Sequence, residues 1–173
     1  MNNKIYTFII SKSGECELIQ LFGYANKGLP GVELVGFGQH GRHLKEKLIF
    51  LSRQNQFQFP LKRYVLCFEQ HRSIVDPKKW DLSWLELPLL ILFWSLTGNL
   101  PIQRLDNCIS CGAIDLEGHL RHYPVDLKKW QKIDEEHRQK EMHLNYIGDA
   151  LPLELQNIHL LNSEELFCST DPQ

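Results

Sequence analysis

The stretch WLELPLLILFWSLTG, residues 84–98, is the most apolar part of the chain and limits how the rest can fold around it. Its apolar core from Leu87 to Trp94 is far shorter than the roughly 18 residues that a membrane-spanning helix requires. Pro88 fits well only in the first turn of a helix, and Gly98 is a typical residue just beyond a helix end. The stretch therefore predicts a mostly buried helix over residues 85–96.

Strand patterns lie on both sides of this helix. β-branched and aromatic residues cluster in KIYTFII and CELIQLFGY around the turn SKSGE, which predicts an opening hairpin. A third strand, VELVGF, precedes a helix whose Leu44, Leu48 and Leu51 repeat at helical spacing and which ends near Asn55. The remaining predicted elements are a strand RYVLCFE, a hairpin CISCGAIDLEGHLRHY turning at Leu116 and Glu117, a polar helix DLKKWQKIDEEHRQK beginning at Asp126, two strands MHLNYI and NIHLL, and a short tail helix.

This order, βββαβα followed by a hairpin, a helix and strands, predicts an α/β or α+β sandwich with helices packed on a mixed β-sheet. The chain has 173 residues, 43% of them hydrophobic, which is typical of one globular domain spanning 1–173. Five cysteines without a secretory signal indicate reduced thiols. We expect a cytoplasmic protein with no membrane segment.

A glycine-rich loop follows the third predicted strand. Gly36, Gly38 and Gly41 have the G-x-G-x-x-G spacing of dinucleotide-binding loops, in which a pyrophosphate rests on a helix amino terminus. Two strands precede this loop, however, and the next acid at a strand end, Glu69, lies 28 residues after Gly41 rather than ~20. Arg42 directly follows Gly41 where small residues would favour close helix packing. We interpret the loop as a glycine-rich turn and expect no cofactor.

The motifs NKGLPGVELVG, NQFQFPLKRYVLCF, LPLLILFWSLTGNLP and GAIDLEGHLRHYPV occur in this order along most of the chain. Together they resemble the amino-terminal domain of the magnesium-chelatase-like ATPases typified by the competence protein ComM. The resemblance implies the fold of the Lon protease proteolytic domain, also described as ribosomal-protein-domain-2-like. It also implies that the glycine loop connects a strand to a helix and holds no nucleotide.

Two activities of related proteins lack their motifs here. No G-x-x-x-x-G-K-[ST] is present to hold nucleotide phosphates, so we expect no ATPase motor and no branch migration of DNA by this chain alone. The resemblance to Lon-type peptidases places Trp84 at the position of their serine and Leu127 at that of their lysine, with Ser83 and Lys128 one residue away. A serine nucleophile needs an adjacent base, so we expect no peptidase activity and no catalytic residue.

The segment CISC, with Cys108 and Cys111, precedes His119 and His122, and these residue types can bind zinc. Side chains three apart on a strand point to opposite faces. With a two-residue turn, Cys111 would lie opposite His122, which gives two ligands where a structural zinc site needs four. Buried, reduced cysteines are the alternative that we favour, and no metal is expected.

Charge is unevenly distributed along the chain. Residues 42–79 contain nine Lys/Arg and three acids, a net charge of +6, whereas residues 141–173 contain six acids and no Lys/Arg, a net charge of −6. Such stretches are commonly solvated faces, but a basic stretch can also bind nucleic acid. Trp80 and Trp84 beside it can stack on bases or belong to a core or interface. The candidate nucleic-acid or partner surface comprises Lys62, Arg63, Arg72, Lys78 and Lys79.

The sequence thus predicts a non-catalytic domain that acts by binding. Its expected partner is a protein, such as an AAA+ ATPase or a second copy of the chain, in DNA processing or natural transformation. Binding of DNA or RNA through residues 42–79 is the first alternative. A degenerate Lon-like serine peptidase is the second.

Overall fold

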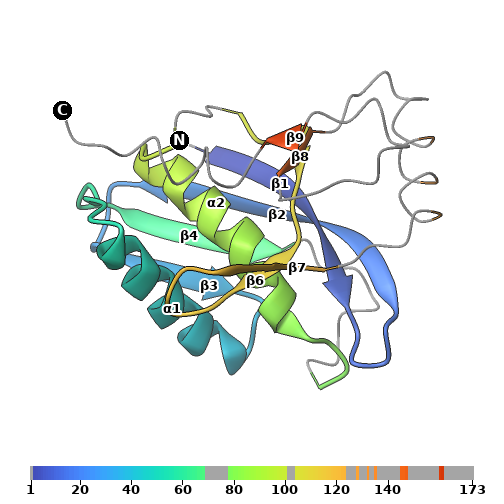
Figure 1. Ribbon diagram of the computed structural model, residues 1–173. Helices are drawn as coiled ribbons and strands as arrows, with labels where there is room; N and C mark the ends of the chain where they lie inside the picture. The colour runs from blue at the N-terminus through green and yellow to red at the C-terminus, as the bar shows by residue number, and fades with distance from the viewer. Residues whose placement is uncertain are drawn as a thin grey trace.

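A computed structural model describes residues 2–68, 78–100, 104–123, 128, 132, 135, 145–147 and 160–161 (Figure 1). These residues form a mixed α/β structure. Its helices are α1 (His40–Gln54), the short 3-10 helix η2 (Leu82–Leu85) and α2 (Glu86–Thr97). Its strands are β1 (Asn2–Ile10), β2 (Cys16–Asn26), β3 (Gly31–Val35), β4 (Arg63–Phe68), β5 (Cys108–Ile109), β6 (Gly112–Ile114), β7 (Leu120–His122), β8 (Asn145–Ile147) and β9 (Leu160–Leu161).

The main sheet is mixed, as predicted. Its strand order is β3-β4-β2-β1-β5-β8-β9, and β6 pairs with β7 in a separate hairpin. The opening hairpin of β1 and β2 is antiparallel, and β2 continues antiparallel to β4. By contrast, β3 is parallel to β4, so β3, α1 and β4 form a β-α-β unit at one edge of the sheet.

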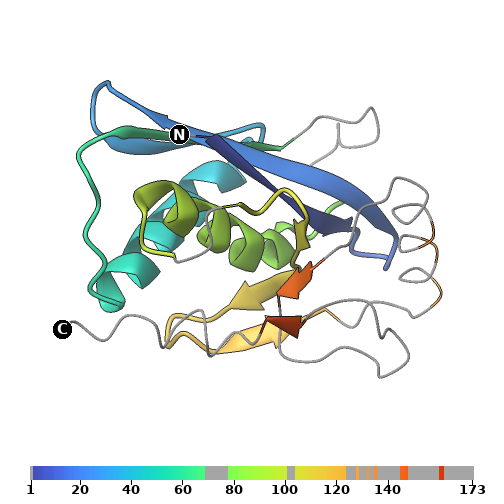
Figure 2. The same cartoon turned by 90° about the horizontal axis from the view of Figure 1, so that it is seen from above.

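Helix α2 lies in the middle of the molecule, and all twelve of its residues are buried. It packs on β1, β2 and β4 on one side, on α1 beside it, and on β6 on the other side. Figure 2 shows these layers in order, with the blue strands above the two helices and the yellow hairpin below. The expected buried helix is confirmed, including Pro88 in its first turn and Gly98 after its end, where φ is +80°.

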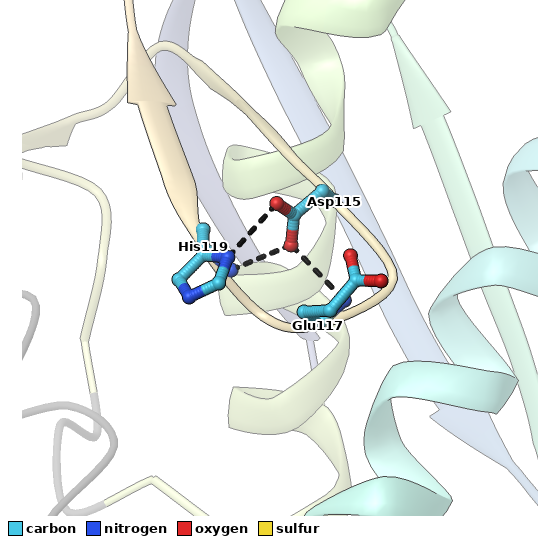
Figure 3. A group of neighbouring side chains, drawn as sticks. All are labelled: Asp115, Glu117 and His119. Atoms are coloured by element: carbon cyan, nitrogen blue, oxygen red, sulfur yellow. Dashed lines mark hydrogen bonds and ion pairs between the residues drawn. The ribbon is translucent and has the colours of Figure 1, made fainter.

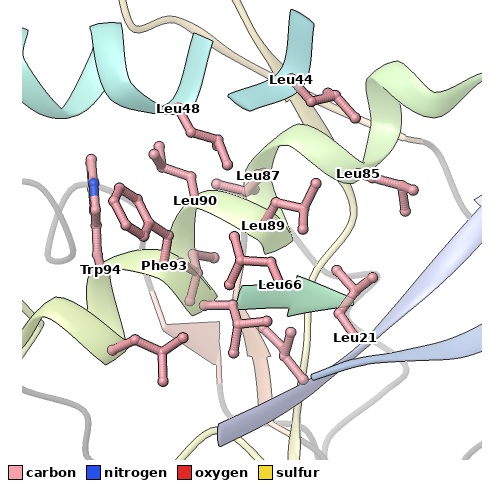
Figure 4. Close-up of a cluster of buried hydrophobic side chains, with 14 of the residues drawn as sticks. Leu21, Leu44, Leu48, Leu66, Leu85, Leu87, Leu89, Leu90, Phe93 and Trp94 are labelled. Atoms are coloured by element: carbon pink, nitrogen blue, oxygen red, sulfur yellow. The ribbon is translucent and has the colours of Figure 1, made fainter. Parts of the chain in front are cut away.

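One face of the sheet forms the main core with the helices. Alternate strand residues point toward α2, and Ile5 on β1 is one of them. Leu21 and Leu66 lie together with α2 residues such as Leu89 and Phe93 (Figure 4). Helix α1 adds its predicted apolar positions, including Leu44 and Leu48, to the same cluster. A smaller cluster lies around Phe8, Ile10, Ile109, Cys111 and Tyr146.

Gly23 on β2 permits the close approach of α2 to the sheet. A Cβ atom at this position would lie 2.8 Å from the carbonyl oxygen of Val65 and 3.0 Å from a methyl carbon of Leu96. Real Cβ atoms almost never come that close to a backbone atom. A larger residue at position 23 would therefore push the helix from the sheet.

The predicted hairpin over residues 108–123 needs two corrections. Cys108–Ile109 does not belong to it, because this segment is β5 and pairs with β1 and β8 in the main sheet. The turn also has three residues rather than two, since Gly118 at φ +88° adds one position, and Gly112 rather than Cys111 pairs with His122. A slip of one residue changes which side chains share a face.

Other predicted elements are described only in part. Lys128, Lys132 and Glu135 are helical and exposed, while Asp126 and the rest of that predicted polar helix lie outside the described residues. The predicted strands MHLNYI and NIHLL are present as β8 and β9, and the tail helix lies outside the described residues. In the part of the chain that the structure covers, neither α1 nor α2 is long and apolar enough to cross a membrane.

Candidate functional site

A cleft of about 890 Å³ opens where the first residues of α1 and α2 meet the β1–β2 turn and the β6–β7 hairpin. Both helices begin at the same end of the molecule (Figure 1). The cleft has a charged lining drawn from four separate segments. The basic lining residues are Lys12, His40, His43, Lys47, Lys78, His119 and Arg121, and the acidic ones are Asp81, Glu86 and Asp115.

The glycine-rich loop places the start of α1 at this cleft. Gly36 has φ +95°, and a Cβ there would lie 3.2 Å from the ring of Phe68, so both conformation and space favour glycine. Gly41 lies where a Cβ would only touch Phe37 and the backbone of Leu34 at ordinary contact distances. The loop connects β3 to α1, as the family resemblance implies.

The first turn of α1 has the reverse of the usual charge pattern. Acidic side chains stabilise a helix amino terminus, but this turn contains none and instead has His40, Arg42 and His43. Gln39, at the N-cap position, makes no side-chain capping hydrogen bond. His40, His43 and Lys47 follow one another at spacings of three and four residues, so they share one helix face, which lines the cleft.

A buried ion pair joins the two helices beside the cleft. Lys47 Nζ lies 2.6 Å from Glu86 Oε2, and the side chains are 17% and 7% exposed. The other carboxylate oxygen of Glu86 accepts a hydrogen bond from the backbone N–H of Ile114 on β6. Glu86 therefore connects α1, α2 and the β6–β7 hairpin, and both of its oxygens are occupied.

Ser83 lies in the cleft lining, but its hydroxyl is used in a helix cap. Its Oγ donates a 2.6 Å hydrogen bond to Asp81 Oδ1, which also accepts from the Ser83 backbone N–H at the start of η2. Trp84 is half-buried and packs edge-on against Tyr123, with the Arg121 guanidinium 4.9 Å from its ring centroid. Lys128 is exposed, and Leu127 lies outside the described residues.

The tip of the β6–β7 hairpin brings Asp115, Glu117 and His119 together at the edge of the cleft (Figure 3). These residues could offer ligands to a metal ion, but all three are exposed. The Asp115 carboxylate accepts hydrogen bonds from the backbone N–H groups of Glu117 and His119 and contacts His119 Nδ1 at 3.0 Å. The hydrogen bonds from His119 lower the pKa of Asp115. These contacts are those of a turn stabilised by an aspartate side chain, so the three residues come together without a metal ion.

The CISC cysteines lie in different hydrophobic clusters. Cys108 belongs to the main core and Cys111 to the smaller cluster. Burial raises the pKa of Cys108 to about 11 and that of Cys111 to about 12. His119 is in the exposed turn, and the side chain of His122 lies outside the described residues. The described geometry does not bring Cys108, Cys111 and His119 into one ligand set.

The structure divides the candidate basic surface between two ends of the sheet. Lys62 and Arg63 adjoin the end of β2 at Asn26, whereas Lys78 and Lys79 adjoin the β1–β2 turn. The eleven residues of β2 separate these ends by roughly 35 Å. Arg72 lies outside the described residues.

Two of these cations have acidic partners. Arg63 binds both carboxylate oxygens of Glu33 at 2.9 Å, which lowers the pKa of Glu33 through the hydrogen bond. Lys79 forms an ion pair with Glu15 at 2.8 Å. Of the residues of the predicted surface that the structure describes, Lys78 lines the cleft. Lys79 follows it in the chain.

Trp80 is a core residue with one unusual feature. It is only 3% exposed and belongs to the main hydrophobic cluster, so its ring faces are not available for base stacking. Its indole Nε1 is nevertheless buried without a hydrogen-bond partner among the described residues. Buried polar groups are nearly always satisfied, so this N–H in a cleft-lining residue calls for an explanation.

Sequence reasoning did not select Lys12, His40, His43 or Arg121. The spacing of His40, His43 and Lys47 and the absence of an acid in the first helical turn were a usable signal. Lys12 and Arg121 carried no such signal, because only the tertiary fold brings them to α1. No protein-family model matches the chain, and no curated protein matches it either.

Proposed function

We propose that this chain is a non-catalytic binding domain, similar to the amino-terminal domain of the ComM-type magnesium-chelatase-like ATPases and with their Lon-like fold. A mixed sheet with α1 and α2 packed on one face is compatible with that fold. In this proposal the domain serves in the cytoplasm as an accessory module in DNA processing. It binds a protein partner such as an AAA+ ATPase, or a second copy of itself.

The observation that carries the proposal is that each carboxylate in the lining of the cleft already has a hydrogen-bond or ion-pair partner. Asp81 binds Ser83, Glu86 binds Lys47 and the Ile114 amide, and Asp115 binds its own turn. Every acidic group of the described lining therefore already has a partner. A nucleophile needs a base in reach, and the Ser83 hydroxyl donates to a capping carboxylate instead. A lining rich in lysine and arginine, whose carboxylates all have partners, favours binding of an anionic partner over catalysis by a carboxylate.

Nucleic acid is the second candidate partner, and the basic lining of the cleft favours it. Lys12, Lys78 and Arg121 come from three segments, and such cations neutralise phosphates and release counterions. The cleft, rather than residues 62–63, is then the contact surface. A degenerate peptidase is less well supported, because Ser83 lies in a cap and Trp84 packs on Tyr123.

Two experiments test this function. Capture of an AAA+ ATPase in a pull-down from the native cell supports the accessory role. A gel shift with single- and double-stranded DNA at low and at moderate salt tests the nucleic-acid role, and we expect binding that weakens steeply with salt. Absence of binding at low salt would exclude nucleic acid. ATP hydrolysis or casein cleavage by the purified chain would contradict a non-catalytic domain.

A further inference from the structure

We infer that the cleft holds a phosphate group against the amino terminus of α1. The inference deepens the proposed binding function and rests on it only in taking the ligand to be anionic. The phosphate could be a terminal phosphate or an internal phosphodiester of a nucleic-acid strand. Both offer the same chemistry to the cleft, and the experiment below separates them.

The first reason is the uncompensated charge at the start of α1. A helix amino terminus carries a partial positive charge and unpaired backbone N–H groups, which attract anions. Here Arg42 adds to that positive charge, no acidic residue offsets it in the first turn, and Gln39 provides no cap. Helix α2, which also begins at the cleft, has Glu86 in its first turn, and Asp81 caps η2 directly before it. One of the two helix ends is therefore neutralised from within the protein, and the other is not.

The second reason is independent of the helix end. Trp80 is 3% exposed and lines the same cleft, and its indole N–H has no partner among the described residues. An indole N–H can only donate a hydrogen bond. A ligand that satisfies it must present an acceptor, as a phosphate oxygen does.

The third reason is that the lining offers donors from several directions and few vacant acceptors. Lys12 enters from the β1–β2 turn, Lys78 from the segment before α2, and Arg121 from β7. The acidic residues of the lining are engaged with Ser83, Lys47 and His119. A carboxylate has two oxygens in one plane, whereas a phosphate has oxygens in three dimensions and suits donors that converge from separate elements. The volume of about 890 Å³ leaves room for the rest of a nucleotide.

The direct test is an NMR titration of the full chain with inorganic phosphate and with pyrophosphate, using acetate at equal ionic strength as the reference. We expect the largest shifts at the backbone amides of residues 40–43 and at the Trp80 indole N–H. The double variant Lys12→Ala/Lys78→Ala should weaken phosphate binding about tenfold or more, because it removes two charge-assisted donors. Lys27→Ala/Lys62→Ala removes the same charge from exposed residues outside the cleft and should leave the affinity unchanged.

A third variant tests the helix end without removing any lysine or arginine side chain. Gln39→Asp places a carboxylate beside the amino terminus of α1, where its negative charge should both stabilise the helix and compete with phosphate. We expect weaker phosphate binding together with a thermal unfolding midpoint that is equal to or higher than wild type. Loss of binding through misfolding would lower the midpoint, so the two causes are distinguishable.

Oligonucleotides of one sequence, with and without a 5′-phosphate, identify the source of the phosphate. Preference for the phosphorylated strand assigns a terminal phosphate, and equal binding that depends on Lys12 and Lys78 assigns a phosphodiester. Phosphate shifts away from α1, or equal losses in the cleft and control variants, would overturn the inference. If both cleft variants bind DNA with wild-type affinity, the nucleic-acid role stands and this site is refuted. Phosphate binding at α1 without DNA binding would support this site and exclude the nucleic-acid role.

Discussion

The indole N–H of Trp94 on α2 donates a 2.8 Å hydrogen bond to the hydroxyl of Ser52 on α1, and that hydroxyl in turn donates to the carbonyl of Leu48. Trp94 is 1% exposed and Ser52 is fully buried. The two helices are thus joined by a polar contact inside an apolar cluster, where an unpaired N–H would be costly. This contact fixes how α1 lies on α2, and with it the position of the α1 end of the cleft.

Ser52→Ala should therefore destabilise the protein by about 1–3 kcal/mol, because it leaves the Trp94 N–H buried without an acceptor. In a Trp94→Phe background the same substitution should cost less, since no indole N–H remains. The double-mutant cycle by urea unfolding measures this coupling. Equal costs of Ser52→Ala in both backgrounds would show that the hydrogen bond contributes nothing beyond packing.

The Lys47–Glu86 pair leads to a second prediction. Lys47→Met should cost ~3 kcal/mol, because the Glu86 carboxylate stays buried without its cation. Adding Glu86→Gln should recover part of this loss, since a neutral amide oxygen can still accept from the Ile114 N–H. Chemical denaturation of the wild type, the single variant and the double variant checks both expectations. If Lys47→Met alone is as stable as wild type, the pair is solvated and does not hold α1 to α2.

The buried cysteines should show slow thiol chemistry and an alkaline loss of stability. Burial raises the pKa of Cys108 to about 11 and of Cys111 to about 12, so the folded protein keeps both thiols protonated. A pKa raised on folding contributes stability that is complete below the unfolded-state pKa near 8.5 and lost as the pH rises toward 11–12. Stability should thus fall above about pH 9, and replacing Cys111 by Ala should reduce that slope.

Peptide mapping after thiol labelling at pH 8 tests the same environments directly. Half-buried Cys16 and Cys67 should be modified before Cys108 and Cys111, and denaturant should remove the difference. Labelling of Cys111 as fast as Cys67 in the native protein would contradict its burial.

The elements that depend on local pattern were predictable, and those that depend on one backbone dihedral angle or on distant segments were not. The buried helix α2, the β1–β2 hairpin and the apolar face of α1 followed from composition and spacing. The register of β6 and β7 did not, because Gly118 at φ +88° lengthens the turn by one residue. The presence of a glycine near the turn does not show whether the turn has two residues or three.

The candidate site was harder to predict for a different reason. Lys12, His43 and Arg121 are far apart in the sequence, and only the packing of the hairpins on the helices brings them to one cleft. The basic stretch of residues 42–79 suggested one surface, but β4 carries Lys62 and Arg63 away from Lys78 and Lys79. The net charge of a stretch of sequence does not show at which end of the sheet each of its charged residues lies.

Trp84 provides the last prediction. It is half-buried rather than fully buried, and it packs on Tyr123 and beneath Arg121. Trp84→Ser should therefore cost ~2 kcal/mol, less than the 3–5 kcal/mol that truncation of a fully buried large aromatic residue costs. Trp84→Phe keeps the ring contact with Tyr123 and should cost less.

The serine variant should also fail to cleave casein, because a hydroxyl needs an adjacent base and Asp81 and Glu86 are already engaged. Thermal unfolding and a casein assay on both variants check these expectations. Wild-type stability of Trp84→Ser would show that the ring contributes no packing energy and is free to meet a partner. Casein cleavage by that variant would show that a base lies in reach and would restore the peptidase hypothesis.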